Sequence, residues 1–158
     1  MKRAAFLLLA LCLESPAAGA ENSAWTGTWV LRENQPGGQL TMKIGETNSG
    51  WKMTYKVVGP GAPGTSDTTI VTPLDGKDVP VLIDGKPSKQ TMSISKVDGH
   101  HTVNVIKFSG KEIGVSKAEL SADGNQIKVE TDYAESNPGA PAGKQIQFWD
   151  LKERAASP

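Results

Sequence analysis

Apolar and polar residues alternate in short segments along most of the chain after residue 26. The clearest case is residues 51–57, where four apolar or aromatic side chains are separated by two lysines and a threonine. Alternation of this kind gives a β-strand one apolar face and one polar face. The pattern predicts about ten strands, at residues 27–33, 40–44, 51–57, 68–72, 79–83, 91–95, 102–108, 112–120, 127–133 and 145–151.

The breaks between these segments contain residues that form tight turns. They are Asn48-Ser49-Gly50, Asp75-Gly76, Asp84-Gly85, Asp98-Gly99, Ser109-Gly110 and Asp123-Gly124-Asn125. Asp-Gly and Asn-containing turns tolerate positive φ and favour hairpins, so consecutive strands are expected to be antiparallel. An open sheet of this size would expose its edges, whereas a closed sheet has none. We therefore expect an all-β protein, an antiparallel up-and-down β-barrel of eight to ten strands. A β-sandwich or an open sheet is the alternative.

The first twenty residues follow a different pattern. A basic start, Met1-Lys2-Arg3, precedes ten apolar residues from Ala4 to Leu13, and Ala18-Gly19-Ala20 supplies small residues for cleavage. This arrangement predicts a signal peptide over residues 1–20 and one mature domain over residues 21–158. An N-terminal membrane anchor is the alternative, but ten apolar residues are well short of the ~20 that a spanning helix needs.

Removal of the signal peptide would leave 138 residues with no cysteine and a formal net charge of −1. A cysteine-free domain suits a secreted or periplasmic protein of a bacterium. A lipid anchor at Cys12 is a further alternative, because the three residues before it match a lipoprotein signal in part. The even charge balance excludes nucleic-acid binding by bulk charge, and no apolar stretch after Glu21 could cross a membrane.

Both ends of the predicted domain resemble a known family. The segment Trp25-Thr26-Gly27-Thr28-Trp29-Val30-Leu31 contains a Gly-x-Trp at the start of the first strand, and residues 148–154 end in aromatic and basic residues. This pattern resembles the calycins, which include lipocalins and fatty-acid-binding proteins, and in particular bacterial secreted lipocalin-like domains. The resemblance implies that Trp29 plugs one end of the barrel. Gly27 would let the chain enter closely, and Arg154, or alternatively Lys152, would pack over the indole.

Two features depart from that family. The connection from Asn34 to Gly38 is too short for the paired lid helices of fatty-acid-binding proteins, and the chain lacks the disulfides of many secreted lipocalins. The Gly/Pro-rich segment from Gly59 to Gly64 is expected to form a mobile loop over one barrel mouth, or alternatively a simple surface loop.

The inward face of the predicted barrel supplies the candidate ligand-binding residues. Three methionines beside aromatic residues would make an adaptable wall for an apolar ligand. Tyr55 would orient a polar head group, or alternatively lie at the barrel rim with its hydroxyl in water. The alternative is that the same side chains fill the barrel completely. The candidates are Leu31, Met42, Trp51, Met53, Tyr55, Ile70, Met92, Ile94, Val129 and Phe148.

Residues for catalysis or metal binding are sparse. Adjacent strand residues point to opposite faces, so His100 and His101 are not expected to share a metal. Asp150 could face inward with Phe148 and act as an acid with a raised pKa, or pair with a lysine. No catalytic residue, cofactor or metal is therefore predicted. We expect a binding protein for a small hydrophobic or amphipathic ligand, or alternatively a solid barrel with a structural or protein-interaction role, rather than an enzyme.

Overall fold

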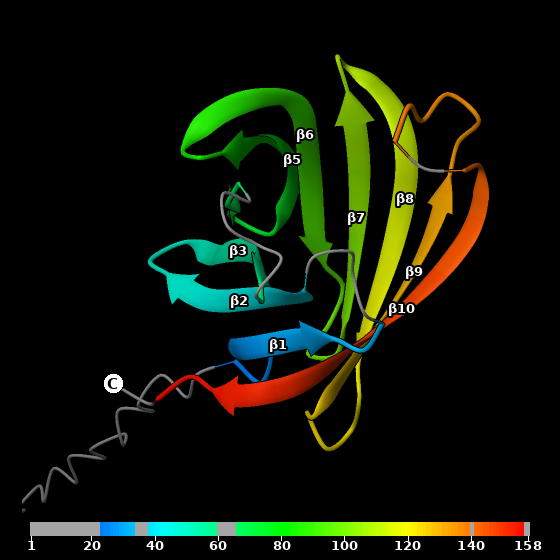
Figure 1. Cartoon of the computed structure of the whole chain (residues 1–158). Helices are drawn as coiled ribbons and strands as arrows, with labels where there is room; N and C mark the ends of the chain where they lie inside the picture. Colours follow the sequence, from blue (N-terminus) through cyan, green and yellow to red (C-terminus); the bar gives the residue numbers. More distant parts are fainter. Residues whose placement is uncertain (1–22, 34–37, 60–65, 140, 157–158) are drawn as a thin grey trace, which may run out of the picture.

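The computed structural model describes residues 23–33, 38–59, 66–139 and 141–156. The predicted signal peptide, Cys12, and most of the 34–38 connection and the 59–64 loop lie outside these ranges. Ten strands span the described residues (Figure 1): β1 (Gly27–Leu31), β2 (Gln39–Thr47), β3 (Gly50–Val58), β4 (Thr68–Thr72), β5 (Asp75–Ile83), β6 (Lys86–Lys96), β7 (His101–Phe108), β8 (Lys111–Leu120), β9 (Gln126–Tyr133) and β10 (Gly143–Arg154).

Each strand pairs with the next along the chain in antiparallel register, and β1 pairs with both β2 and β10. The sheet therefore closes on itself, and the predicted closed antiparallel barrel is confirmed. The sheet is strongly twisted, so β2 and β3 run roughly horizontally in Figure 1 whereas β7 and β8 run roughly vertically. Register shifts within the pairs β1–β10, β5–β6 and β7–β8 help the sheet to curve.

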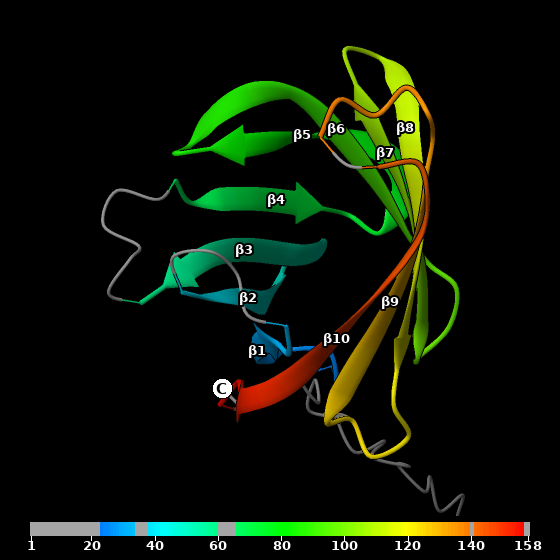
Figure 2. The ribbon, with the colours of Figure 1, turned by 45° about the vertical axis from the view of Figure 1, so that its right-hand side comes forward.

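Strands β4 and β5 share fewer paired residues than any other two neighbouring strands in the described barrel. Figure 2 shows β4 between its two neighbours. It forms five residue pairs with β3 but only two with β5, namely Thr68↔Ile83 and Thr69↔Leu82. The strands diverge towards the short link between them, where Leu74 has a φ of 63°. Within the described residues there is no helix long and apolar enough to cross a membrane.

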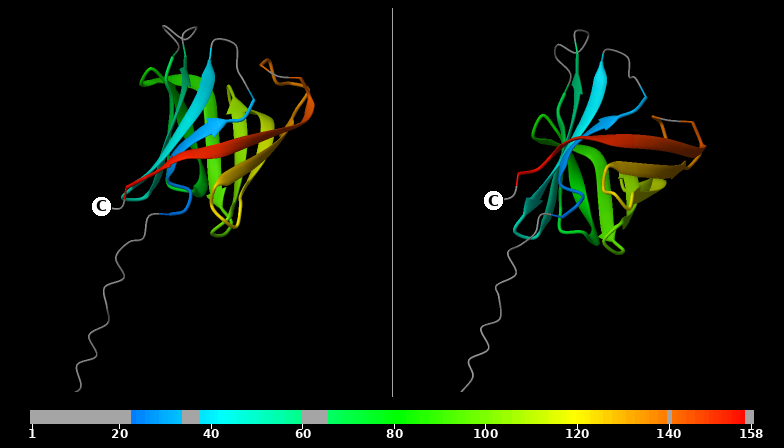
Figure 3. Two further views of the ribbon diagram at one scale, coloured as in Figure 1. Left: turned by 60° about the horizontal axis from the view of Figure 1, so that its bottom comes forward. Right: turned by 90° about the horizontal axis from the view of Figure 1, so that it is seen from below.

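One end of the barrel is closed by tryptophans; it is the lower end in Figure 1 and faces the viewer in the right panel of Figure 3. Trp29 is fully buried, and its Nε1 donates a hydrogen bond to the Trp25 carbonyl at 2.9 Å. Trp25 donates in turn from its own Nε1 to the carbonyl of Gly99, in the β6–β7 turn, at 2.8 Å. The two indoles thus fill this end and tie the chain before β1 to the opposite turn.

A basic side chain covers the plug from outside. The guanidinium carbon of Arg154 lies 5.9 Å from the centre of the Trp29 ring. Its nitrogens donate to the carbonyl of Ala24 and, at 2.7 Å, to the carbonyl of Gly124. Arg154, rather than the exposed Lys152, occupies this place. Trp25, Trp29 and Arg154 together are called the closed end below.

The backbone at the start of β1 has room only for glycine. Gly27 has a φ of +152°, in the region that residues with a side chain rarely adopt. A Cβ added there would lie 2.6 Å from the carbonyl oxygen of Glu153 on β10. The close approach of β1 to β10 therefore depends on this glycine.

Candidate functional site: a cavity inside the barrel

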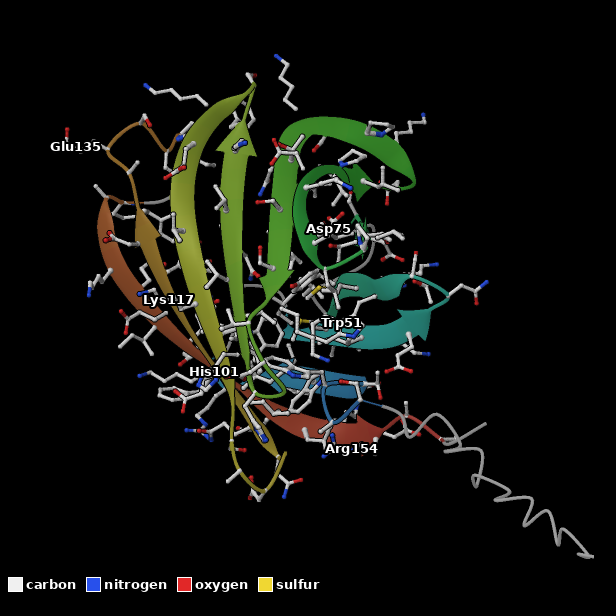
Figure 4. The ribbon with its side chains drawn as sticks, turned by 180° about the vertical axis from the view of Figure 1, so that it is seen from behind. Trp51, Asp75, His101, Lys117, Glu135 and Arg154 are labelled. Atoms are coloured by element: carbon white, nitrogen blue, oxygen red, sulfur yellow. The ribbon has the colours of Figure 1, made fainter. Side chains whose placement is uncertain are left out.

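A cavity of about 240 Å³ lies within the barrel, between the inward faces of β2, β3 and β6–β10. Trp25 from the closed end forms part of its wall, and Trp51 on β3 is labelled in Figure 4. The interior is therefore not filled completely by side chains. The lining residues are Trp25, Met42, Ile44, Trp51, Met53, Tyr55, Gln90, Met92, Ile94, Thr102, Asn104, Ile106, Ser116, Ala118, Ile127, Val129, Thr131, Tyr133, Gln147 and Trp149.

One side of the cavity is apolar and is called the apolar wall. It consists of Met42 and Ile44 on β2, Trp51 and Met53 on β3, and Met92 and Ile94 on β6. The centre of the Trp51 ring lies 5.4 Å from that of Trp25, with a tilt of 42°. Three methionines in one wall let it adapt to the shape of an apolar molecule, because a methionine side chain is unbranched and has three rotatable bonds.

Strands β7–β9 carry a line of polar side chains, called the polar row, which adjoins the apolar wall at β6, where Ile94 pairs in register with Asn104. Asn104 on β7 pairs in register with Ser116 on β8, which pairs with Thr131 on β9. The hydroxyl oxygens of Ser116 and Thr131 are 2.8 Å apart and hydrogen-bonded to each other. Asn104 has no side-chain hydrogen bond to any described residue, and its Oδ1 is buried. The polar row therefore ends in an unpaired amide.

Tyr55 stands beside the apolar wall and faces the cavity. Its ring meets that of Trp149 edge to face, with centres 5.9 Å apart. Burial raises the pKa of the Tyr55 phenol further above its usual value, which already keeps the group neutral at physiological pH. Among the described residues nothing accepts or donates a hydrogen bond at its hydroxyl. It is a second polar group available to a ligand.

The ten predicted ligand-binding residues fall into two groups. The first, which lines the cavity, consists of Met42, Trp51, Met53, Tyr55, Met92, Ile94 and Val129. In the second group, Leu31 and Ile70 are buried in the core without reaching the cavity, and Phe148 lies outside the barrel. Phe148 is only half-buried, and the Arg32 guanidinium lies 5.2 Å from its ring centre. The inward aromatic residue is Trp149, which is 4% exposed.

Asp150 points to the same outer side as Phe148. Arg32 binds it through two hydrogen bonds, Nη2 to Oδ1 at 2.7 Å and Nε to Oδ2 at 3.0 Å. These bonds hold the pKa of the Asp150 carboxyl below its usual value. The expectation of an inward acid with a raised pKa is therefore wrong, and the cation beside it is an arginine.

Sequence reasoning missed the polar row because two of its three residues, Asn104 and Ser116, occupy inward positions next to outward valines, whereas Thr131 lies on the apolar face of β9. On β7, Thr102 and Asn104 line the cavity, whereas Val103 between them lies on the outer face. A hydrophobicity pattern assigns the valine to the interior. Alternation separates the two faces of a strand, but which face points into the barrel depends on the neighbouring strands.

The two histidines lie near the closed end, outside the cavity. The Nδ1 of His101 is within hydrogen-bonding distance of the Asp98 carboxylate, at 2.8 Å, and the Nδ1 of His100 is 3.0 Å from the Leu120 carbonyl oxygen. Each histidine thus already has a partner within the protein. In the part of the chain that the structure describes, no three metal-ligating side chains of His, Cys, Asp or Glu gather at one place.

Comparisons with known proteins address the fold. No protein-family model matches the sequence, and no curated protein matches it significantly. Two solved structures of mutants of the fluorescent protein UnaG are similar to this one. The first has 13% sequence identity and a TM-score of 0.54, and the match covers 84% of this chain and 97% of that chain. The second has 14% identity and a TM-score of 0.55, with coverage of 81% and 96%. At this identity the likeness concerns the fold alone, which is calycin-like.

Proposed function

We propose that the protein is an exported, lipocalin-like binding protein that takes a small hydrophobic or amphipathic molecule into its barrel. The cavity is the observation that carries the proposal. A barrel with a purely structural role gains stability from a filled interior, because empty space forfeits packing contacts. Here about 240 Å³ stays open between an apolar wall and an unpaired polar group. Apolar enclosure with a few polar groups is the usual composition of a small-molecule site.

Export belongs to the same proposal and rests on the sequence. The basic start, the apolar run and the small residues before Glu21 support a cleaved signal peptide and a secreted or periplasmic protein. Mass measurement of the protein from its own host, after fractionation of the cells, tests this part. A mature chain that begins at Glu21 is expected, whereas an uncleaved chain in the cytoplasm, or a chain acylated at Cys12, would contradict it.

Ligand binding is tested by native mass spectrometry on the protein purified from its own host. We expect a bound small molecule that is released on denaturation. A fluorescent probe of hydrophobic sites should also bind the delipidated protein. If the host protein carries no ligand and the delipidated protein does not bind the probe, ligand binding is refuted. The alternative, a solid barrel with a structural or protein-interaction role, is then favoured.

A pair of variants on β8 locates the ligand. Ala118 faces the cavity and is 7% exposed, whereas its neighbour Lys117 faces outward and is exposed. Ala118→Leu adds volume inside the cavity and should reduce probe binding by about tenfold or more, on the scale of 1.4 kcal/mol per factor of ten. Lys117→Leu adds the same side chain outside and should leave probe binding unchanged. Equal probe binding by the two variants would place the ligand elsewhere.

A further inference from the structure

We propose that the cavity selects a molecule with an apolar body and one uncharged hydrogen-bonding head, such as an alcohol or an amide, and excludes carboxylates. The inference rests on the proposed function and concerns the chemistry of the ligand. Asn104, at the end of the polar row, is the residue that would bind the head.

The first argument is the absence of charge. Of the described side chains that line the cavity, none is lysine, arginine, histidine, aspartate or glutamate. Charged residues of the surrounding strands lie outside the cavity, and two of them form ion pairs there: Lys107 on β7 with Asp78 on β5 at 2.7 Å, and Lys144 on β10 with Glu130 on β9 at 3.3 Å. An anionic head inside the barrel would lose its water without gaining a cation, which is strongly unfavourable.

The second argument is the hydrogen-bonding need of Asn104. Its Oδ1 is buried and accepts no hydrogen bond from the described residues. An unpaired buried acceptor is costly, so a ligand that donates to it gains affinity. Alcohols and amides have a proton to donate, whereas an ionised carboxylate only accepts. The side-chain amide can also donate from its NH₂ group, so a head that both donates and accepts fits best.

The neighbours of Asn104 also favour a neutral head that both donates and accepts hydrogen bonds. Ser116, the cross-strand partner of Asn104, is already hydrogen-bonded to Thr131. One hydroxyl of that pair donates to the other, which leaves one proton for a third group. Thr102, two residues before Asn104 on β7, also lines the cavity and has no side-chain hydrogen bond to a described residue. The head would therefore meet neutral donors and acceptors together.

The apolar wall would hold the body of the ligand. It lines the same cavity as the polar row and adjoins it where Ile94 pairs in register with Asn104, so one molecule can touch both. The volume of about 240 Å³ is slightly below the roughly 300–1,000 Å³ typical of small-molecule sites. A short alkyl chain is the appropriate size for a first test.

The experiment compares three eight-carbon probes that differ only in the head: 1-octanol, octanamide and octanoate. Binding to the delipidated protein is followed at pH 8, where the carboxylate is fully ionised. Trp25, Trp51 and Trp149 line the cavity and report its occupancy by their fluorescence; calorimetry confirms the values. We expect octanol and octanamide to bind at least about tenfold more tightly than octanoate. Equal or tighter binding of octanoate would overturn the inference.

Variants test the role of Asn104 itself. Asn104→Leu removes the amide and retains the approximate volume, and it should weaken octanamide binding by about tenfold. It should also raise the Tm of the ligand-free protein, because the unpaired acceptor is gone. Asn48→Leu, at an exposed position in the β2–β3 turn, is the matched control and should leave octanamide binding unchanged. Unchanged octanamide binding by Asn104→Leu would refute the assignment of the head site, and the wild-type comparison stands even if this variant does not fold.

The outcomes also separate this inference from the proposed function. A carboxylic acid extracted from the host protein would uphold a ligand-binding barrel and refute the neutral head. Failure of all three probes and of the hydrophobic fluorescent probe, with no ligand in the host protein, would refute both.

Discussion

The closed end and the polar row differ in whether their buried polar groups are hydrogen-bonded within the protein. At the closed end both indole nitrogens donate to carbonyl oxygens, and the Arg154 guanidinium is bound to two further carbonyls. In the polar row Ser116 and Thr131 are hydrogen-bonded to each other, but the side chain of Asn104 has no hydrogen-bond partner among the residues that the structure describes. Where the buried polar groups are already hydrogen-bonded within the protein, they stabilise the fold and are not available to a ligand. A region with an unused hydrogen-bonding group beside open space sacrifices stability and can bind a molecule.

The comparison predicts that substitutions at the closed end affect stability most. Trp29→Ala removes a fully buried indole and the contact with Arg154, and should lower the free energy of unfolding by roughly 3–5 kcal/mol. Urea denaturation of the two proteins measures the difference. Val71→Ala, at an outward position that is 47% exposed, is the control and should change little. An unchanged unfolding midpoint for Trp29→Ala would show that the plug does not hold the barrel closed.

A smaller effect is expected where the closed end meets the backbone. Gly27→Ala places a Cβ against the Glu153 carbonyl and forces an alanine into a strained φ, so it should destabilise the protein by about 1–3 kcal/mol. Gly45→Ala is the control, since Gly45 lies in β2 with nothing within 4 Å of the added Cβ and no positive φ. Its effect should be neutral or slightly stabilising. Equal stability of the two alanine variants would mean that β1 can move away from β10 without cost.

The same contrast explains how much the sequence could predict. Alternation and turn residues predicted the ten strands, because strand period and tight turns are local properties, although the predicted turn Asp75-Gly76 lies inside β5 and the break is at Pro73-Leu74. Closure of the sheet was expected because an open sheet would expose its edges. The Gly-x-Trp at residues 27–29 also located the start of β1, where the glycine has a backbone role. Both depend on residues close together in the chain.

The candidate site was predicted only where inward residues are apolar. On β3, Trp51, Met53 and Tyr55 alternate with polar residues, and all three line the cavity. On β7, Asn104 lies inside while Val103 lies outside, and no residue of this strand was among the predicted ligand-binding residues. Phe148 and Trp149 on β10 are adjacent aromatic residues, and only the pairing of Trp149 with Ile127 on β9 decides which one faces inward. These faces are set by register with neighbouring strands.

A substitution within the polar row sharpens the contrast between satisfied and unsatisfied groups. Ser116→Ala breaks the hydrogen bond to Thr131 and leaves a buried hydroxyl unpaired, so it should destabilise the ligand-free protein by about 1 kcal/mol. Asn104→Leu should act in the opposite direction, as argued above. Thermal and urea unfolding of both variants show whether each one is more or less stable than the wild-type protein. If both variants destabilise, Asn104 is satisfied in solution, and the distinction between the members of the row disappears.

The smallest effect is expected outside both regions, at the exposed pair of Arg32 and Asp150. Their side chains are 50% and 47% exposed, so solvent screens the interaction and a change in Tm of only about 1–2 °C is expected for Asp150→Asn at pH 7. Because Arg32 lowers the pKa of Asp150 below 3.8 in the folded protein, its stabilisation is complete above the pKa of the unfolded chain.

That stabilisation is lost as the pH falls through the lowered folded value, where the carboxyl gains a proton and no longer binds the guanidinium as an anion. The Tm difference between wild type and Asp150→Asn should therefore be constant from pH 7 to about 5 and vanish in stronger acid. A difference that grew as the pH fell would require a carboxyl with a raised pKa. A raised pKa would support an inward, acidic Asp150 and would contradict its pairing with Arg32.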